Sequence, residues 1–144
     1  MNTDNLVEFR KDIGLTQEEM GKIIGVKQST YACYENGIEN ISIIRLNIIA
    51  NKFHKSLNFL TGVSRSDDID FIEKDFTRKD IGNILKSERK KLNMTQEKLS
   101  KELNVDRVSI SWYETGRGVT IPVLIQYSEL FNKSIDYLCG KADN

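Results

Sequence analysis

One segment of this chain occurs twice, and the repeat constrains the fold more than any other feature. Residues 15–37 return 79 positions later as residues 94–116. Both copies begin with an apolar residue and Thr-Gln-Glu, and both end with Tyr-Glu-x-Gly. A repeat of this kind indicates one structural unit present twice. The 144 residues leave roughly 60 for each unit, which is near the lower limit for an independent core.

Each copy is predicted to form two short helices joined by a sharp turn. Thr16 and Thr95 stand where the first of these helices begins, and threonine is a favourable N-cap. Glu19 lies three residues after Thr16, which completes a capping box in the first copy. Residue types that tolerate a positive φ stand where the chain must turn, at Gly25, Gly37, Asn104 and Gly116. The residues that follow the first turns, Val26 and Val105, are expected in the core.

This pattern is a helix-turn-helix signature, and both copies resemble the lambda Cro and repressor type of helix-turn-helix domain. The shared elements are an arginine ahead of Leu-Thr-Gln-Glu (Met-Thr-Gln-Glu in the second copy), an apolar residue after the turn, and an aromatic residue followed by Glu-x-Gly. The resemblance covers nearly the whole of both halves. It implies an all-α fold of two tandem five-helix, lambda repressor-like DNA-binding domains. We expect the first domain at residues 3–63, an acidic linker at 64–76 and the second domain at 77–141.

Capping residues predict the remaining helices of each unit. Thr77 and Asp80 form a capping box ahead of the second motif, with Phe76 placed to staple onto Ile81. After Gly37 the offset between the copies falls from 79 to 78, so one loop of the second copy is a residue shorter. The other expected caps are Thr3 for the first helix, Ser42 and Thr120 for the fourth, and Ser56 and Ser134 for the fifth.

The charge distribution separates the two copies. Basic and acidic residues are equal at 21 each, so the net charge is zero, which argues weakly against nucleic-acid binding. Residues 1–64 are neutral, residues 65–80 carry −2, and residues 81–144 carry +2. We therefore expect the second copy to dominate a modest, salt-sensitive DNA affinity.

Several chemistries are not expected. One histidine and two separated cysteines, Cys33 and Cys139, cannot form a zinc cluster, and both thiols are expected to be free. The chain has no Ser/His/Asp set and no phosphate-binding glycine loop, so we predict neither catalysis nor a cofactor. It also lacks an apolar run long enough to span a membrane and a secretory leader, so a cytoplasmic protein is expected.

The resemblance implies DNA contacts from the second and third helix of each unit. The family's backbone-contacting glutamine, which opens the second helix, is matched by Gln17 and Gln96. The third helix enters the major groove and presents its N-terminal residues to base edges. The matched positions are Lys27, Gln28, Ser29, Cys33 and Asn36 in the first copy, and Asp106, Arg107, Val108, Trp112 and Thr115 in the second.

The chemistry of these side chains suggests what each reads. Gln28 can pair bidentately with adenine, Arg107 can pair with guanine, and Val108 can touch a thymine methyl group. Asn36 and Thr115 are matched to phosphate contacts.

Three residues of the third helices have a competing interpretation. Cys33 is a plain small residue or a DNA contact. Trp112 contacts DNA or covers apolar surface against a partner. Asp106 is expected to cap its helix, with its carboxylate turned onto the helix amides rather than toward phosphate.

The resemblance also matches Arg10 with Glu35, and Arg89 with Glu114, as partly buried ion pairs. Each pair would tie the first helix of its unit to the end of the third helix. The expected role is structural, because removing one partner leaves a charge poorly compensated.

Two functions remain open at this level. The first is a sequence-specific DNA-binding transcriptional regulator, expected to be a repressor, which binds double-stranded DNA and can form a homodimer. The alternative is an antitoxin-like or antirepressor-like module whose main task is to hold a protein partner. The zero net charge and Trp112 fit that alternative.

The linker also has two interpretations. It is either solvated throughout, or it docks on a domain through Ile69, Phe71 and Ile72. Fully extended, residues 63–76 would reach roughly 46–50 Å at about 3.3–3.6 Å per residue. Half-sites one helical turn apart are separated by about 34–36 Å. By reach alone, one chain would then place both third helices on two unlike half-sites.

Overall fold

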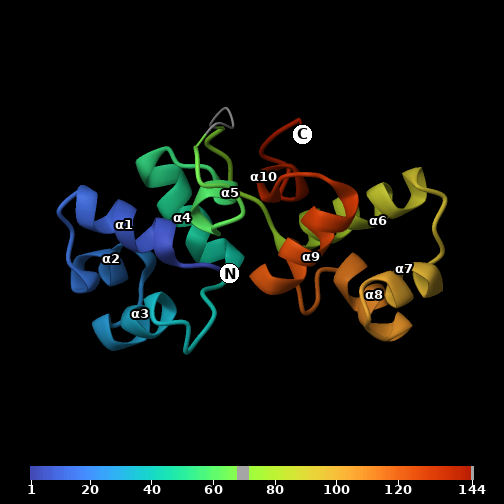
Figure 1. The fold of residues 1–144 in the computed structure, drawn as a ribbon, viewed down its shortest axis with the longest axis horizontal. Coiled ribbons are helices and arrows are strands. Elements are labelled where there is room, and N and C mark those ends of the chain that lie inside the picture. Colours follow the sequence, from blue (N-terminus) through green and yellow to red (C-terminus); the bar gives the residue numbers. More distant parts are fainter. Residues whose placement is uncertain (68–71, 144) are drawn as a thin grey trace. The chain divides into compact units, whose positions relative to one another are not determined.

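The computed structural model describes residues 1–67 and 72–143, and over these residues all the regular secondary structure is α-helix (Figure 1). It divides into two compact units, Met1–Lys74 and Asp75–Asn144. The first unit holds α1 (Asp4–Asp12), α2 (Gln17–Ile24), α3 (Gln28–Glu35), α4 (Ile43–Phe53) and α5 (Leu57–Leu60). The second holds α6 (Arg78–Lys91), α7 (Gln96–Glu102), α8 (Arg107–Glu114), α9 (Ile121–Phe131) and α10 (Ile135–Leu138). The prediction of an all-α fold with two tandem five-helix units is confirmed.

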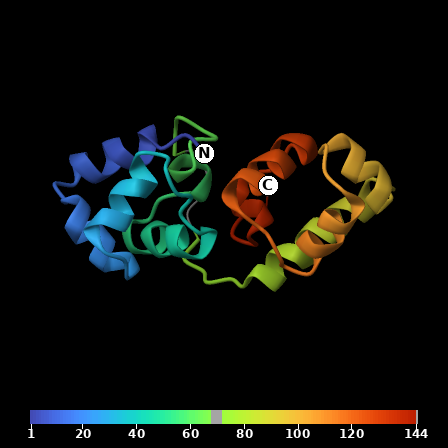
Figure 2. The same ribbon diagram turned by 90° about the horizontal axis from the view of Figure 1, so that it is seen from below.

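The five helices of each unit lie grouped together in Figures 1 and 2. Each group encloses its own core of buried apolar side chains. In the first unit α2 packs on α3 and α4, and in the second α6 and α7 both pack on α8. The first core includes Leu6, Met20, Tyr31, Leu46 and Ile49, and the second includes Ile81, Leu99, Ile110, Leu124 and Tyr127. Burial of these side chains is the main term that stabilises helices too short to persist alone.

Most of the predicted caps and turns are present. The Thr16 hydroxyl accepts from the Glu19 amide at 3.1 Å, and the capping boxes at Thr16 and Thr77 are both complete. The backbone takes a positive φ of 77° at Gly25 and 54° at Asn104, where the turn between the motif helices needs it. The remaining predicted caps with side-chain hydrogen bonds are Ser42, Ser56, Thr95, Thr120 and Ser134.

The prediction that Thr3 caps α1 is wrong. Its backbone has ψ of 0°, and its hydroxyl donates instead to the carbonyl oxygen of Glu35 at 2.8 Å. The Asn2 side-chain oxygen accepts from the Asp4 amide at 2.9 Å and satisfies one of the first amides of α1. Thr3 therefore joins the start of α1 to the end of α3.

Two further predictions need correction. Asp106 occupies the N-cap position of α8, but its carboxylate makes no capping hydrogen bond. Its backbone carbonyl accepts from the Ser109 amide at 3.0 Å, so that amide is already satisfied. Val26 and Val105 are half-buried rather than in the core, because they lie in the turn at the edge of each unit.

Parts of the expected linker are bonded to the first unit through polar groups. The side-chain amide of Asn5 donates to the Ser64 carbonyl at 2.8 Å, and Asp67 accepts from the Ser56 amide at 2.9 Å. The backbone of Lys74 bonds to side chains of α4. Ile72 is 45% exposed, and the other two apolar residues expected to dock, Ile69 and Phe71, lie outside the described residues.

Candidate nucleic-acid interface

The first helix and the end of the third helix in each unit are joined by a buried ion pair. Arg10 Nε lies 2.6 Å from Glu35 Oε2, and Arg10 Nη2 lies 2.9 Å from Glu35 Oε1. The third guanidinium nitrogen donates to the Leu15 carbonyl at 2.9 Å, so the arginine also holds the loop before α2. Each guanidinium nitrogen thereby donates one hydrogen bond, at a site where the side chain is only 9% exposed.

The second unit repeats this geometry. Arg89 Nε lies 2.6 Å from Glu114 Oε2, Nη2 lies 3.0 Å from Oε1, and Nη1 donates to the Met94 carbonyl at 2.8 Å. Both expected ion pairs are thus present, and each is bidentate, the arrangement that suits a guanidinium facing a carboxylate.

The glutamine that opens the second helix is anchored to this pair. Gln17 Nε2 donates to Glu35 Oε1 at 3.1 Å, and Gln96 Nε2 donates to Glu114 Oε1 at 3.1 Å. One N–H of each amide group is therefore turned inward, and each glutamine is held at the surface in a defined orientation. The pKa of Glu35 lies below its usual range, since hydrogen bonds from Arg10 and Gln17 outweigh the effect of burial.

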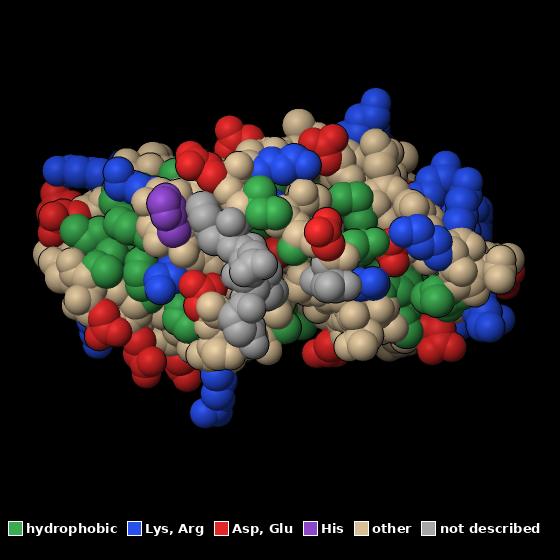
Figure 3. Space-filling model, turned by 90° about the horizontal axis from the view of Figure 1, so that it is seen from above, with side chains coloured by type: hydrophobic (Ala, Val, Ile, Leu, Met, Phe, Trp, Pro, Cys, Tyr) green, Lys and Arg blue, Asp and Glu red, His purple; other side chains and the backbone are tan. Residues whose placement is uncertain are grey.

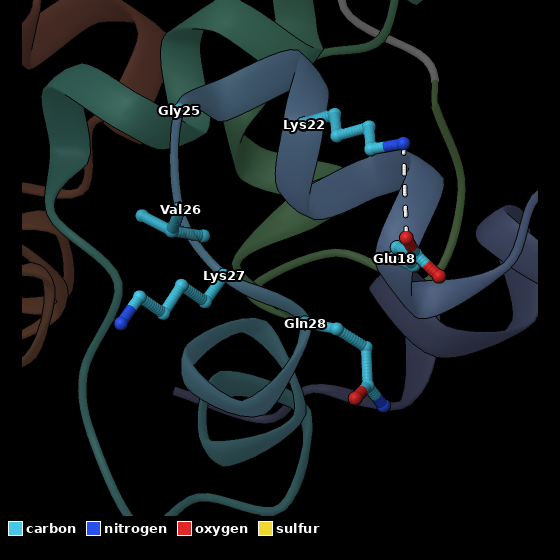
Figure 4. A pocket seen from close by; sticks show the side chains of 6 residues that line it. All are labelled: Glu18, Lys22, Gly25, Val26, Lys27 and Gln28. Atoms are coloured by element: carbon cyan, nitrogen blue, oxygen red, sulfur yellow. Dashed lines mark ion pairs between the residues drawn. The ribbon is translucent and has the colours of Figure 1, made fainter.

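The first unit extends the network onto its third helix. Gln28 Nε2 donates to Gln17 Oε1 at 3.3 Å, so the chain of contacts runs from Glu35 through Gln17 to Gln28. Figure 4 shows that the side chains of Lys27 and Gln28 leave the backbone in different directions. The second unit has Arg107 at the position of Gln28, and no such bond from Arg107 to Gln96 is found.

A shallow surface depression of about 740 Å³ borders the start of α3 in the first unit. Its lining residues are Glu18, Lys22, Gly25, Val26, Lys27 and Gln28. Lys22 and Glu18 form an exposed ion pair across 3.7 Å on one wall (Figure 4). The depression is open to solvent and suits an extended surface contact better than an enclosed small molecule.

The outer faces of α3 and α8 are accessible along their length. In the first unit Lys27, Gln28, Ser29 and Asn36 are exposed and Cys33 is half-buried. In the second unit Asp106, Arg107 and Thr115 are exposed, and Val108 and Trp112 are 50% and 51% exposed. The Thr115 hydroxyl donates to the Trp112 carbonyl at 2.8 Å, so its proton is already used within the helix end.

One cation at this surface was not singled out from the sequence. Arg117 is exposed, and its amide donates to the Trp112 carbonyl at 2.9 Å, which holds it at the C-terminal end of α8. The first unit has Ile38 at the same position, bonded in the same way to the Cys33 carbonyl and 73% exposed. An arginine directly after the capping Gly116 was the available signal.

Positive charge on the second unit is not confined to α8. Lys and Arg side chains gather over this unit on the face in Figure 3. On α6 the exposed lysines are Lys79, Lys86, Lys90 and Lys91. The positive charge of the second unit therefore lies only in part on α8 and beside it.

A buried tyrosine lies beside the ion pair of each unit, but the two tyrosines come from non-equivalent helices. Tyr31 on α3 and Tyr127 on α9 are both fully buried. Burial raises the pKa of both phenols, and the neighbouring carboxylates Glu35 and Glu114 raise it further. The position of Tyr31 holds Ile110 in the second unit, and that of Tyr127 holds Ile49 in the first. The two units therefore fill the same two core positions with one tyrosine and one isoleucine in opposite order.

The described residues include no group of three or more His, Cys, Asp or Glu side chains placed to hold a metal ion. The described cysteines are both free, and burial raises the pKa of the Cys139 thiol. No helix in the described part combines the length and the apolar character needed to cross a membrane.

The family model described as Helix-turn-helix matches residues 6–60 and, separately, residues 85–138. The chain belongs to the helix-turn-helix family. Each match spans one of the two units, so this family's domain occurs twice in the chain.

Similar helix-turn-helix proteins include regulators and an antitoxin. The HTH-type transcriptional regulator ImmR of Bacillus subtilis is 37% identical over 62 residues, 42% of this chain and 49% of that protein. The cryptic phage CTXphi transcriptional repressor RstR of Vibrio cholerae is 34% identical over 58 residues, 40% of this chain and 52% of that protein. Antitoxin PezA of Streptococcus pneumoniae is 34% identical over 58 residues, 40% of this chain and 37% of that protein.

The chain thus spans between about a third and a half of the length of these relatives. No solved structure matches it.

Proposed function

We propose that the chain is a sequence-specific DNA-binding transcriptional regulator, acting as a repressor, that reads double-stranded DNA with α3 and α8. The main observation behind this proposal is the anchored glutamine of each unit. Gln17 at the start of α2 and Gln96 at the start of α7 are each hydrogen-bonded to the glutamate of the buried ion pair. A surface amide fixed in this way is preorganised for a fixed, repeated partner such as a DNA phosphate.

The third helices supply the base contacts. A helix of this motif lies in the major groove with its N-terminal residues against base edges. Gln28 is held by Gln17 and keeps its own carbonyl oxygen and a second N–H, the pattern that pairs with adenine. Arg107 pairs bidentately with guanine, and Val108 contacts a thymine methyl group.

Flanking residues supply the phosphate contacts. Lys27 and Asn36 border α3, and Arg117 borders the C-terminal end of α8. Thr115 is left out of this set, because its hydroxyl donates to the Trp112 carbonyl. Because Arg117 replaces the apolar Ile38, the second unit has a cation at a flank where the first has none. The second unit accordingly contributes more of the affinity.

A second candidate function rests on α8. Val108 and Trp112 lie one helical turn apart and are each about half exposed, which gives this helix an apolar strip. An antitoxin is among the relatives. In this alternative α8 holds a protein partner, and that contact rather than DNA reading is the main task of the chain.

A binding assay at two salt concentrations tests the proposed function. The full chain is titrated into a pool of random-sequence duplexes at roughly 50 mM and 200 mM salt. A DNA reader binds the pool and loses affinity steeply at the higher salt, because bound cations release counterions. The test variants are Gln17→Ala and Gln96→Ala, which should weaken binding to all sequences alike. Absence of a salt-dependent complex would exclude DNA binding in favour of the protein-holding function.

A further inference from the structure

The segment between the two domains is held to the first unit by a pair of asparagine side chains. Asn51 Oδ1 accepts from the Lys74 N–H at 3.2 Å, and Asn51 Nδ2 donates to the Lys74 carbonyl at 3.2 Å. Asn47 Nδ2 donates to the same carbonyl at 2.9 Å. One side-chain amide thus pairs with both backbone groups of Lys74, and a second reinforces it. We call this arrangement the amide clamp, made by Asn47 and Asn51 on Lys74.

The clamp explains two residues that are otherwise unfavourable where they stand. Asparagine is a poor residue for a helix interior, and Asn47 is buried in the middle of α4 with 4% exposure. The corresponding residues of α9 in the second unit are Ile125 and Glu129. The polar pair at these two positions is thus a feature of the first unit, where it contacts Lys74.

A second anchor lies earlier in the same segment. Asp67 Oδ1 accepts from the Ser56 amide at 2.9 Å, and Asp67 Oδ2 lies 3.8 Å from Lys55 Nζ. Ser56 is the N-cap of α5, so this carboxylate also satisfies an amide at the start of that helix. Both Asp67 and Lys74 thus belong with the first unit.

The clamp shortens the tether between the two readers. The second unit begins its own structure at Phe76, which is buried, and at Thr77, the N-cap of α6. Only two residues, Asp75 and Phe76, separate the clamped Lys74 from Thr77. Those three steps reach roughly 10–11 Å at about 3.3–3.6 Å per residue, against roughly 46–50 Å for the free segment.

We propose that the amide clamp determines the half-site spacing that one chain recognises. This inference rests on the proposed function, since it concerns how two DNA readers on one chain are joined. A short tether restricts the separations at which α3 and α8 can engage one duplex together. A long tether permits many separations and lowers the effective concentration of the second reader at each.

The clamp itself is tested without DNA. Amide hydrogen exchange at Lys74 is followed in the full chain, in the variant Asn47→Ala/Asn51→Ala and in the control Ile48→Ala. Alanine preserves α4 because it is the best helix former, and Ile48 is an exposed residue of the same helix. We expect protection of the Lys74 amide to fall at least about tenfold in the double variant and to stay unchanged in the control. Rapid exchange of this amide in the unmodified chain would overturn the inference.

The spacing preference is tested with half-sites selected from a random pool. Duplexes carry the two selected half-sites at separations that increase by one base pair. The unmodified chain and Ile48→Ala should bind best within a narrow range of separations, and Asn47→Ala/Asn51→Ala should bind over a broad range with a lower maximum. Equal affinity of the unmodified chain at all separations overturns the spacing inference but leaves the proposed function intact. Failure to bind any duplex overturns both.

Discussion

The two units share one scaffold and differ in what it presents. In each, a bidentate ion pair joins the first and third helices and holds the glutamine that opens the second helix. The outward residues at equivalent positions differ. Gln28, Ser29 and Cys33 of the first unit are replaced by Arg107, Val108 and Trp112 in the second. Buried groups that satisfy one another leave little freedom to change, whereas exposed positions of a third helix change without cost to the core.

The core shows the same rule in a subtler form. Tyr31 and Ile49 in the first unit are Ile110 and Tyr127 in the second, so the two core positions keep their pair of residues but exchange them. The total side-chain volume and the phenol near the ion pair are both retained. A core tolerates rearrangement when volume and polar surroundings are conserved together.

The largest effect is expected when one partner of a buried ion pair is removed. Arg89→Ala leaves Glu114 as a buried charge without its bidentate partner, and the second unit should lose about 3–5 kcal/mol of stability. Lys90→Ala is the matched control, because Lys90 is the exposed neighbour on the same helix. Thermal unfolding checks this, and equal melting temperatures for the two variants would defeat the claim that the pair holds the unit together.

The second prediction concerns how the stability contributed by the Arg10–Glu35 ion pair depends on pH. The pKa of Glu35 is lowered in the folded state, so its contribution to stability is complete above the unfolded value of about 4.3 and is lost as pH falls through the folded value. Denaturant unfolding of the full chain and Glu35→Gln should differ by a constant amount above about pH 5, and the gap should shrink below about pH 4. A gap that widens in acid would contradict the sign of the shift.

The third prediction concerns the readers themselves. Arg107→Ala should cost about 1–3 kcal/mol of DNA affinity and relax specificity at one base pair. Gln28→Ala should cost less, because a neutral amide pairs with a base more weakly than a charged guanidinium does. Affinities of both variants for selected duplexes decide the order. A far larger loss for Gln28→Ala would mean that the first unit dominates.

The smallest effect is expected at the residue that follows the capping glycine of the third helix, Arg117 in the second unit and Ile38 in the first. Arg117→Ile gives the second unit the residue that the first has at Ile38, and it should weaken binding to all sequences alike. The slope of log affinity against log salt should fall by about one. Ile38→Arg should produce the opposite change. Unchanged slopes in both variants would remove Arg117 from the interface.

Local rules explain what could be predicted from the sequence. The caps at Thr16, Thr77 and Ser42 and the turn at Gly25 depend on residues within three or four positions, so a short pattern contains the whole interaction. The ion pairs were accessible only through the family resemblance, because their partners lie 25 residues apart.

Long-range contacts explain what the sequence did not reveal. Thr3 was expected to cap α1, but its hydroxyl donates a hydrogen bond to a carbonyl 32 residues away. The linker was expected to dock through apolar residues or not at all, yet asparagines 23 and 27 residues before Lys74 hold its backbone. No short sequence pattern indicates a partner so far away in the chain. For the same reason, the fully extended reach expected for residues 63–76 is longer than the free part of this segment allows.

A footprint on a selected operator decides whether both units read DNA. The unmodified chain and Gln96→Ala/Arg107→Ala are compared, since the variant disables the second reader and spares its ion pair. We expect the unmodified chain to protect two unlike half-sites and the variant to lose protection of one of them. Protection of one short half-site, the same for both proteins, would show that the second unit does not read DNA and would reassign it to partner binding.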